Sequence, residues 1–294
     1  MKQGTPTMGG IIILVGVLVA CGLVAQWTPA LVLAVVVTLV TGSLGLLDDI
    51  ESVAHGRSLG LTPSQKMVGL VLISVSFCLV AVNVCGIAPE IRFPGGLSLD
   101  LGMLATTFPV GGAEVTVPWL YLVFVFLLMA GLSNAVNLTD GLDGLAGGCT
   151  MVVMLFMAMV AYRYNELDLA IFAGSIAGAC VGFLWHNCYP ASIFMGDTGS
   201  LALGAALASL AVLTKTEVTS LIMGGLFVCE ALSVMIPGHE LQAHRPPGLP
   251  HDADPPPLRA DGVGGEQGRH PLLGSSPRPS PRSASPCTSS SARG

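Results

Sequence analysis

Residues 118–144 read PWLYLVFVFLLMAGLSNAVNLTDGLDG, and this stretch combines the two features that decide the fold. Its first part, 118–136, is a continuous apolar run of roughly the 20 residues that a helix needs to cross a bilayer. Its second part, Asn134 to Gly144, is rich in amides, carboxylates and glycines. The stretch therefore predicts a membrane-spanning helix that ends in a segment suited to a metal or a polar ligand.

Composition places the whole chain in a membrane. Of its 294 residues, 52% are hydrophobic and 10% are charged, whereas a soluble domain carries roughly 25% charged residues. A soluble surface of this size would need far more charge, so we predict an integral membrane protein. The sequence has no basic stripe and no aromatic platform, and nucleic acid is therefore not an expected partner.

Eight continuous apolar runs are candidates for membrane spans. With ends defined to within a few residues, they are 8–26, 30–47, 66–86, 118–136, 145–162, 169–186, 199–213 and 218–236. The runs do not alternate between polar and apolar residues, and lipid accepts only helices or closed barrels. We therefore expect an all-α, polytopic helix bundle with about eight transmembrane helices.

The connections between eight spans would alternate between the two sides of the membrane. One side would hold the connections 1–7, 48–65, 137–144 and 187–198, and nearly every motif-like segment belongs to this set. The sequence thus predicts a single active face. The positive-inside rule does not orient that face, because Lys and Arg are equally frequent in the connections of both sides.

Four short polar segments on the predicted active face could carry chemistry. They are Lys2 to Gly10, Asp48-Asp49, Asn134 to Gly144, and Phe194 to Ser200. Paired carboxylates at a membrane boundary are costly unless a cation or another partner uses them. Glycines let backbone N–H groups approach a phosphate closely. Taken singly, each segment could equally be a solvated helix end, a polar turn or a helix cap.

Together the segments bring five carboxylates to one face, namely Asp48, Asp49, Asp140, Asp143 and Asp197. Such a density of negative charge calls for Mg²⁺ or for bound protons. Proteins typically hold Mg²⁺ with one or two carboxylates plus substrate phosphates. We therefore expect phosphoryl transfer between a soluble phosphate donor and an acceptor held in the bilayer.

The polar segments resemble the signature blocks of the phospho-N-acetylmuramoyl-pentapeptide transferase family. The similarity covers Lys2 to Gly10, Gly45 to Asp49, Asn134 to Gly144 and Phe194 to Gly204, in matching order and spacing, and extends from residue 2 to about 236. It implies transfer of phospho-N-acetylmuramoyl-pentapeptide from its UDP carrier to undecaprenyl phosphate. The products would be lipid I, for peptidoglycan biosynthesis, and UMP. It also implies Mg²⁺ as the cofactor and a bacterial plasma-membrane protein of about ten helices, with its active site facing the cytoplasm; a homodimer is left open.

The resemblance alone supplies the residue roles. Asp48 and Asp49 match a catalytic pair, and Asp197 matches a Mg²⁺ ligand that takes part in catalysis. The matching substrate-binding positions are Lys2, Thr7, Asn134, Asn137, Asp140, Asp143 and Phe194, with Phe194 near the uracil. Ser52 stands where the family usually has a lysine, which predicts a weaker grip on the nucleotide if no other basic residue substitutes.

Both ends depart from the family pattern. The family has about one more helix before the first block, so we expect a misassigned start or a truncated gene. Residues 1–236 would form the catalytic domain, and the Pro/Arg/Ser-rich residues 237–294 read as a disordered tail. We expect a frameshift near Pro237, because three histidine codons of the family's next block, read one base early, give Pro255 to Pro257. The chain as written would then be inactive or poorly folded.

Two other functions stay open at this point. A sister enzyme would transfer phospho-N-acetylglucosamine to a polyprenyl phosphate, although Gly4 to Gly10 and Asn137 to Asp140 match the muramoyl enzyme more fully. An ion-coupled transporter would hold its carboxylates near the bilayer midplane. Here they cluster at the ends of spans, which favours an enzyme working at the membrane surface.

Overall fold

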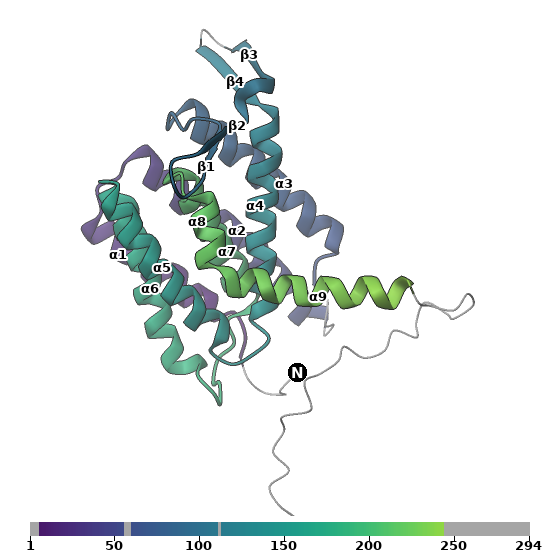
Figure 1. Cartoon of the computed structure of the whole chain (residues 1–294). Coiled ribbons are helices and arrows are strands. Elements are labelled where there is room, and N and C mark those ends of the chain that lie inside the picture. The colour runs from purple at the N-terminus through teal and green to yellow at the C-terminus, as the bar shows by residue number, and fades with distance from the viewer. Residues whose placement is uncertain (1–5, 56–59, 111–112, 244–294) are drawn as a thin grey trace, which may run out of the picture. The chain divides into compact units, whose positions relative to one another are not determined.

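The computed structural model describes residues 6–55, 60–110 and 113–243, which form a helix bundle with two small β-hairpins (Figure 1). The helices are α1 (Gly10–Val24), α2 (Pro29–His55), α3 (Pro63–Asn83), α4 (Trp119–Thr139), α5 (Leu145–Arg163), α6 (Leu167–Asn187), α7 (Gly196–Leu213), α8 (Glu217–Met223) and α9 (Gly225–Ala243). The α3–α4 connection holds β1 (Glu90–Arg92), β2 (Ser98–Asp100), the 3₁₀ turn η1 (Gly102–Leu104), β3 (Ala105–Val110) and β4 (Ala113–Pro118).

The predicted all-α membrane bundle is confirmed. Within the described residues, the six helices α2 to α7 are long and apolar enough to cross a membrane, and α8 with α9 makes a seventh if this pair, bent by 74°, is one span. Helix α1 has only 15 residues and is shorter than a full span. Helix α9 runs to Ala243, past the boundary expected at 236; most of the predicted tail, 244–294, lies outside the described residues.

Helix α3 begins at a capping box that fixes its first turn. Thr62 Oγ1 accepts the Gln65 N–H (3.4 Å), Gln65 Oε1 accepts the Thr62 N–H (2.9 Å), and Pro63 takes the first helical position. These contacts satisfy backbone donors that a helix start leaves without partners. They also set the direction in which Lys66, one turn into the helix, projects.

Helix α7 forms the centre of the bundle, and every residue from Thr198 to Leu213 is buried. Helices α1, α2 and α4 pack against it. The crossings occur at glycines: a side chain at Gly45 would overlap the Asp197 backbone, and one at Gly204 would overlap the backbone of Ser133. Because lipid offers no hydrophobic drive between helices, close van der Waals packing through small residues supplies much of the association energy.

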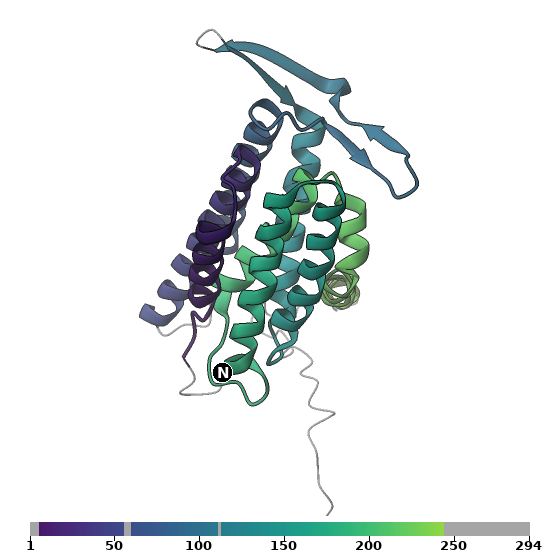
Figure 2. The same cartoon turned by 90° about the vertical axis from the view of Figure 1, so that its left-hand side faces the viewer.

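The two ends of the bundle differ in structure. We call the end where α2 and α4 finish and α7 begins the site end, and the opposite end the distal end. The distal end carries two antiparallel hairpins, β1–β2 and β3–β4 (Figure 2). Residues 87–117 separate two apolar runs in the sequence, and hairpins this short have little periodicity by which the sequence could predict them.

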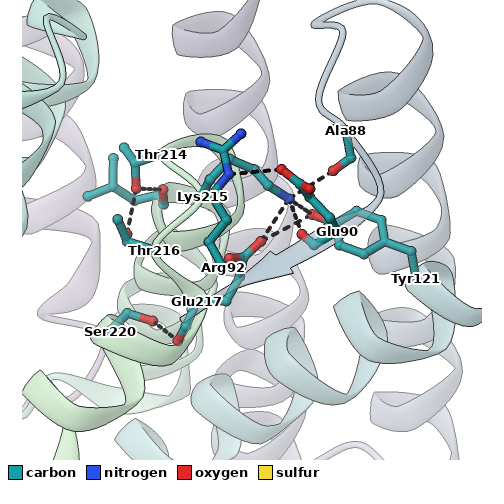
Figure 3. A network of polar contacts seen from close by, with 10 residues as sticks. Ala88, Glu90, Arg92, Tyr121, Thr214, Lys215, Thr216, Glu217 and Ser220 are labelled. Atoms are coloured by element: carbon teal, nitrogen blue, oxygen red, sulfur yellow. Dashed lines mark hydrogen bonds and ion pairs between the residues drawn. The ribbon is translucent and has the colours of Figure 1, made fainter. Parts of the chain in front are cut away.

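A buried ion pair ties the distal end together (Figure 3). Lys215 Nζ donates to the carbonyls of Ala88 and Glu90 and to Tyr121 Oη (3.0 Å), and it pairs with Glu217 Oε1 at 3.1 Å. The Glu217 side chain is fully buried and that of Lys215 is 9% exposed. Burial lowers the pKa of Lys215, while the Glu217 charge opposes this shift. The network links β1, α4 and the α7–α8 turn.

Gly204→Ala should destabilise the protein by about 1–3 kcal/mol, because the added methyl group meets backbone atoms that cannot turn aside. The matched control is Gly131→Ala on α4, where a methyl group finds open space. Thermal unfolding followed by detergent size-exclusion should show a lower midpoint for the first variant alone. Equal midpoints would contradict the close crossing of α4 and α7.

Lys215→Met should cost about 3–5 kcal/mol, since it leaves the buried Glu217 carboxylate without its cation. The double variant Lys215→Met/Glu217→Gln removes both charges and should recover most of this loss. The measurement is a double-mutant cycle on the unfolding midpoint in detergent. Additive single effects would show that the ion pair does not couple the two residues.

Candidate active site

Asp49, in the last two turns of α2, caps the first turn of α7 from outside that helix. Its Oδ1 accepts the Asp197 N–H (3.1 Å), and its Oδ2 accepts the N–H (3.0 Å) and the hydroxyl (2.6 Å) of Thr198. A carboxylate is well suited to the N–H groups and positive dipole of a helix start. Gly196, with φ of 74°, leaves room for it, because a Cβ there would lie 2.6 Å from Asp49 Oδ2.

Asp48 and Asp197 share one cation. Lys66 Nζ lies 3.1 Å from Asp48 Oδ2 and is also hydrogen-bonded to Asp197 Oδ2. The second oxygen of Asp48 accepts the Leu61 N–H at 2.7 Å. These side chains are partly open to solvent, with 24% of Lys66, 22% of Asp197 and 10% of Asp48 exposed. Three helices thus contribute to one charged cluster at the site end.

Asp140 lies just past the end of α4 and interacts electrostatically with Asp197 and Asp49. Burial raises the pKa of its carboxyl to about 7, and the negative charges of Asp197 and Asp49 act in the same direction. A hydrogen bond from the Gly196 backbone opposes the rise. A cation placed among these carboxylates would lower this pKa again, because opposite charge favours the ionised form.

Asp143 and Asn187 hold the loop that precedes α7. Asp143 Oδ2 accepts the Ala191 N–H at 3.0 Å. Asn187 Oδ1 accepts the Gly144 N–H (3.1 Å), and its Nδ2 donates to the Ile193 carbonyl (2.9 Å). Asp143 therefore contributes to the shape of the site through the backbone it binds, in addition to the substrate contact that the resemblance implies.

The segment before α1 lies against the same loop. The Phe194 N–H donates to the Pro6 carbonyl (2.9 Å), and the Phe194 carbonyl accepts the Gly9 N–H (2.8 Å). Thr7 is exposed beside Gly196, since its Oγ1 would be 3.0 Å from a Cβ at that glycine. The pairing brings the first and last signature blocks side by side, although about 190 residues separate them in sequence.

The structure therefore gathers most of the residues that the sequence singled out. Asp48, Asp49, Asp140 and Asp197 lie within electrostatic reach of one another, and Thr7 and Phe194 adjoin them. Asn134 donates to the Ala130 carbonyl of its own helix (2.7 Å), and Asn137 is half-buried in the last turn of α4. Lys2 lies outside the described residues.

Sequence reasoning gave no role to two residues that organise the cluster, Lys66 and Thr198, although Thr198 lies in one of the polar segments it singled out. Lys66 belongs to α3, and only the fold brings it to Asp48 and Asp197. The available signal was the capping box of Thr62 and Gln65, which marks a helix start on the predicted active face and so places Lys66 in the first turn of that helix. Ser52 stands where the resemblance implies a lysine, and Lys66 supplies a cation to Asp48 and Asp197 from the neighbouring helix α3.

The cluster is chemically suited to a divalent cation, although it is not a preformed cage. Among residues 6–55, 60–110 and 113–243, no three His, Cys, Asp or Glu side chains come close enough to form a metal site by themselves. The Lys66 ammonium nevertheless lies between Asp48 and Asp197, so these carboxylates do accept a cation between them. Two carboxylates completed by substrate phosphates is a usual arrangement for Mg²⁺.

Comparison with known proteins gives two family matches. Residues 31–215 match glycosyl transferase family 4, and residues 2–14 match the first signature of phospho-N-acetylmuramoyl-pentapeptide-transferase. The signature covers the segment that packs against Phe194, and the longer match includes Asp48, Asp49, Asp140 and Asp197.

Curated relatives agree with these matches. The phospho-N-acetylmuramoyl-pentapeptide-transferase of Bacillus subtilis strain 168 is 43% identical over 240 residues, covering 80% of this chain and 69% of the relative. Those of Desulforudis audaxviator and Rubrobacter xylanophilus are 45% and 42% identical, with 80% of this chain and 70% and 69% of the relatives covered. The chain belongs to glycosyl transferase family 4 and, within it, to the phospho-N-acetylmuramoyl-pentapeptide-transferase family.

Proposed function

We propose that this chain transfers phospho-N-acetylmuramoyl-pentapeptide from UDP to undecaprenyl phosphate. A phosphate oxygen of the lipid would attack the sugar-bound phosphorus of the nucleotide substrate. A new P–O–P bridge then forms, the bond to UMP breaks, and lipid I and UMP are released. Family membership and the names of the relatives support this reaction.

The observation that carries the proposal is the cation shared by Asp48 and Asp197 at one end of the membrane bundle. Both substrates carry phosphates, and one of them is anchored in the bilayer. A site for their reaction must therefore lie at a membrane surface and balance negative charge with cations. The site end meets both requirements, because the cluster lies where α2 ends and α7 begins.

The two neighbouring aspartates would have different roles. Both oxygens of Asp49 already accept hydrogen bonds from the first turn of α7, so this residue positions Asp197. Asp48 Oδ2 pairs with the flexible Lys66 side chain at 3.1 Å. Asp48 is therefore the better candidate for taking a proton from the lipid phosphate, and Lys66 would be free to turn toward a substrate phosphate.

Mg²⁺ is the proposed cofactor, and Asp197 would hold it together with phosphates of the substrates. When bound, the ion would neutralise charge on the pyrophosphate that is being broken. The chain's own residues do the rest of the work. Lys66 offsets the charge of the carboxylates, Asp140 adds to the negative field, and Thr7 and Phe194 border the place where the nucleotide would lie.

The substrate partners would reach the site from two directions. UDP-N-acetylmuramoyl-pentapeptide would enter from the aqueous side of the site end, with Asn134, Asn137, Asp140 and Asp143 lining its path. Undecaprenyl phosphate would enter from the lipid. We propose that the site end faces the cytoplasm of a bacterial plasma membrane. A homodimer stays an expectation from the resemblance.

The competing functions have less support. Transfer of phospho-N-acetylglucosamine would need the same cluster, but the signature matched at residues 2–14 is that of the muramoyl enzyme. An assay with each UDP-sugar separates the two. A transporter would need ionisable side chains near the bilayer midplane, whereas the charged cluster lies at helix ends.

The frameshift near Pro237 stays a proposal, since residues 244–294 lie outside the described part of the chain. Resequencing the gene around the Pro237 codon tests it directly. A corrected frame should restore the family's histidine block and should raise UMP release over that of the chain as written. If resequencing finds no inserted base at this codon, the frameshift proposal is wrong and residues 237–294 are encoded as written.

Asp197→Ala should lower Mg²⁺-dependent UMP release by at least about a hundredfold, the scale seen when one charge-stabilising group leaves a preorganised site. The measurement uses purified protein in detergent, and the substitution is tested in the chain as written and in the frame-corrected chain. Glu51→Ala is the matched control, because this carboxylate is on the same helix end but is half exposed and pairs with the exposed His55. Retained activity in Asp197→Ala would rule out its proposed role.

Asp48→Asn and Asp49→Asn should separate chemistry from structure. Asp48→Asn should abolish UMP release with little change in the unfolding midpoint, since the amide oxygen can still accept the Leu61 N–H. Asp49→Asn should also lower stability by about 1–3 kcal/mol, because its amide nitrogen would face the donors of Thr198. Identical stability of the two variants would argue against distinct roles.

A further inference from the structure

The β3–β4 hairpin at the distal end has two chemically different faces. In an antiparallel pair, directly opposed residues share a face, and faces alternate along each strand. Phe108 opposes Val115, and Thr106 opposes Val117, on what we call the apolar face. Glu114, the single charged residue of the two strands, falls on the opposite face.

The apolar face is partly open, because Thr106 and Phe108 are exposed whereas Val115 and Val117 are half-buried. Phe108 is 49% exposed, and Met103 and Leu104, which lead into β3, are 75% and 63% exposed. Large apolar side chains that are exposed close together in sequence usually mark an interaction site.

The lipid-facing surface of α4 continues directly onto this face. Trp119, Val123 and Leu127 follow one another at intervals of four residues, and each is at least half exposed, so they form one stripe along the membrane span. At the top of that stripe, Trp119 Nε1 donates a 2.9 Å hydrogen bond to Thr106 Oγ1 on the apolar face. Trp side chains gather at the membrane–water interface, with the ring in the headgroup region.

A second contact fixes the hairpin relative to the membrane. Asn83, the last residue of α3, donates from Nδ2 to the Thr116 carbonyl (2.9 Å) and accepts the Thr116 N–H on Oδ1 (2.8 Å). Both α3 and α4 are candidate spans, so the hairpin is held at the level where they leave the bilayer. Figure 2 shows the β3–β4 hairpin extending sideways from the helix ends instead of folding back onto them.

We propose that the apolar face of β3–β4 rests on the lipid surface of the leaflet at the distal end. Phe108 enters the headgroup region beside Trp119, and Glu114 points to water. The continuity of this face with the lipid-facing stripe of α4 selects lipid over a soluble partner or a second copy of the chain. The inference does not depend on the proposed reaction, which takes place at the other end of the bundle.

The test compares probes on the two faces of the ribbon. Dansylalanine is incorporated at position 108 or, as the matched control, at position 107 of the full chain, and each protein is reconstituted singly into phosphatidylcholine nanodiscs. Nitroxide-labelled phosphatidylcholine should quench the probe at position 108 severalfold more than the probe at position 107. Aqueous iodide should show the reverse order. Positions 115 and 116 give a second matched pair, and unfolding midpoints confirm that each variant folds.

Three outcomes would overturn the proposal. Stronger iodide quenching at position 108 than at position 107 would show that the apolar face meets water and is open to a soluble partner. Equal lipid quenching on both faces would show that the ribbon has no fixed orientation. A third outcome has two parts: with one copy per disc the lipid quenching at position 108 is weak, and protection from iodide appears only with two copies per disc. This outcome would assign the apolar face to a second chain.

Discussion

The close approach of α7 to its neighbours is the constraint on which the rest of the structure depends. Helix α7 is buried along nearly all its length, and it reaches that position because glycines stand where other helices cross it. The crossing at Gly45 presses α2 against the backbone of Asp197, one helical turn from Asp48 and Asp49. The packing of the core and the assembly of the acidic cluster are therefore one geometric event. Any side chain at that crossing would separate the carboxylates.

The acidic residues of the cluster are not equivalent, even though they lie close together. Asp49 is fully used as a cap on α7 and thereby fixes the backbone of Asp197. Asp48 and Asp197 instead share the charge of Lys66. In a partly buried site, where the effective dielectric constant is well below that of water, such charges interact strongly and must be balanced. The cluster thus combines one carboxylate that holds the backbone of α7 with two that share a lysine cation.

Each end of the bundle contains a lysine that neutralises carboxylates, but the two ion pairs differ in how far they are exposed to solvent. At the distal end, Glu217 is fully buried and Lys215 is 9% exposed. The Lys215 ammonium also donates hydrogen bonds to backbone carbonyls and to Tyr121. That pair is shielded from solvent, and it links β1 and α4 to the α7–α8 turn. At the site end the corresponding ions remain partly exposed. An ion pair that solvent and substrate can reach costs less to open, because less desolvation energy is tied to its geometry.

The sequence by itself determined the membrane environment, the helical class, the approximate spans and the residues of the signature blocks, because composition and long apolar runs are local properties. It did not reveal the hairpins, whose strands are three to six residues long, and it gave too many full-length spans because α1 is short. It marked Asp48, Asp49 and Asp197 but not their different partners. Only the tertiary structure decided those, since Lys66 and Thr198 meet the acidic pair across helix contacts that no local pattern records.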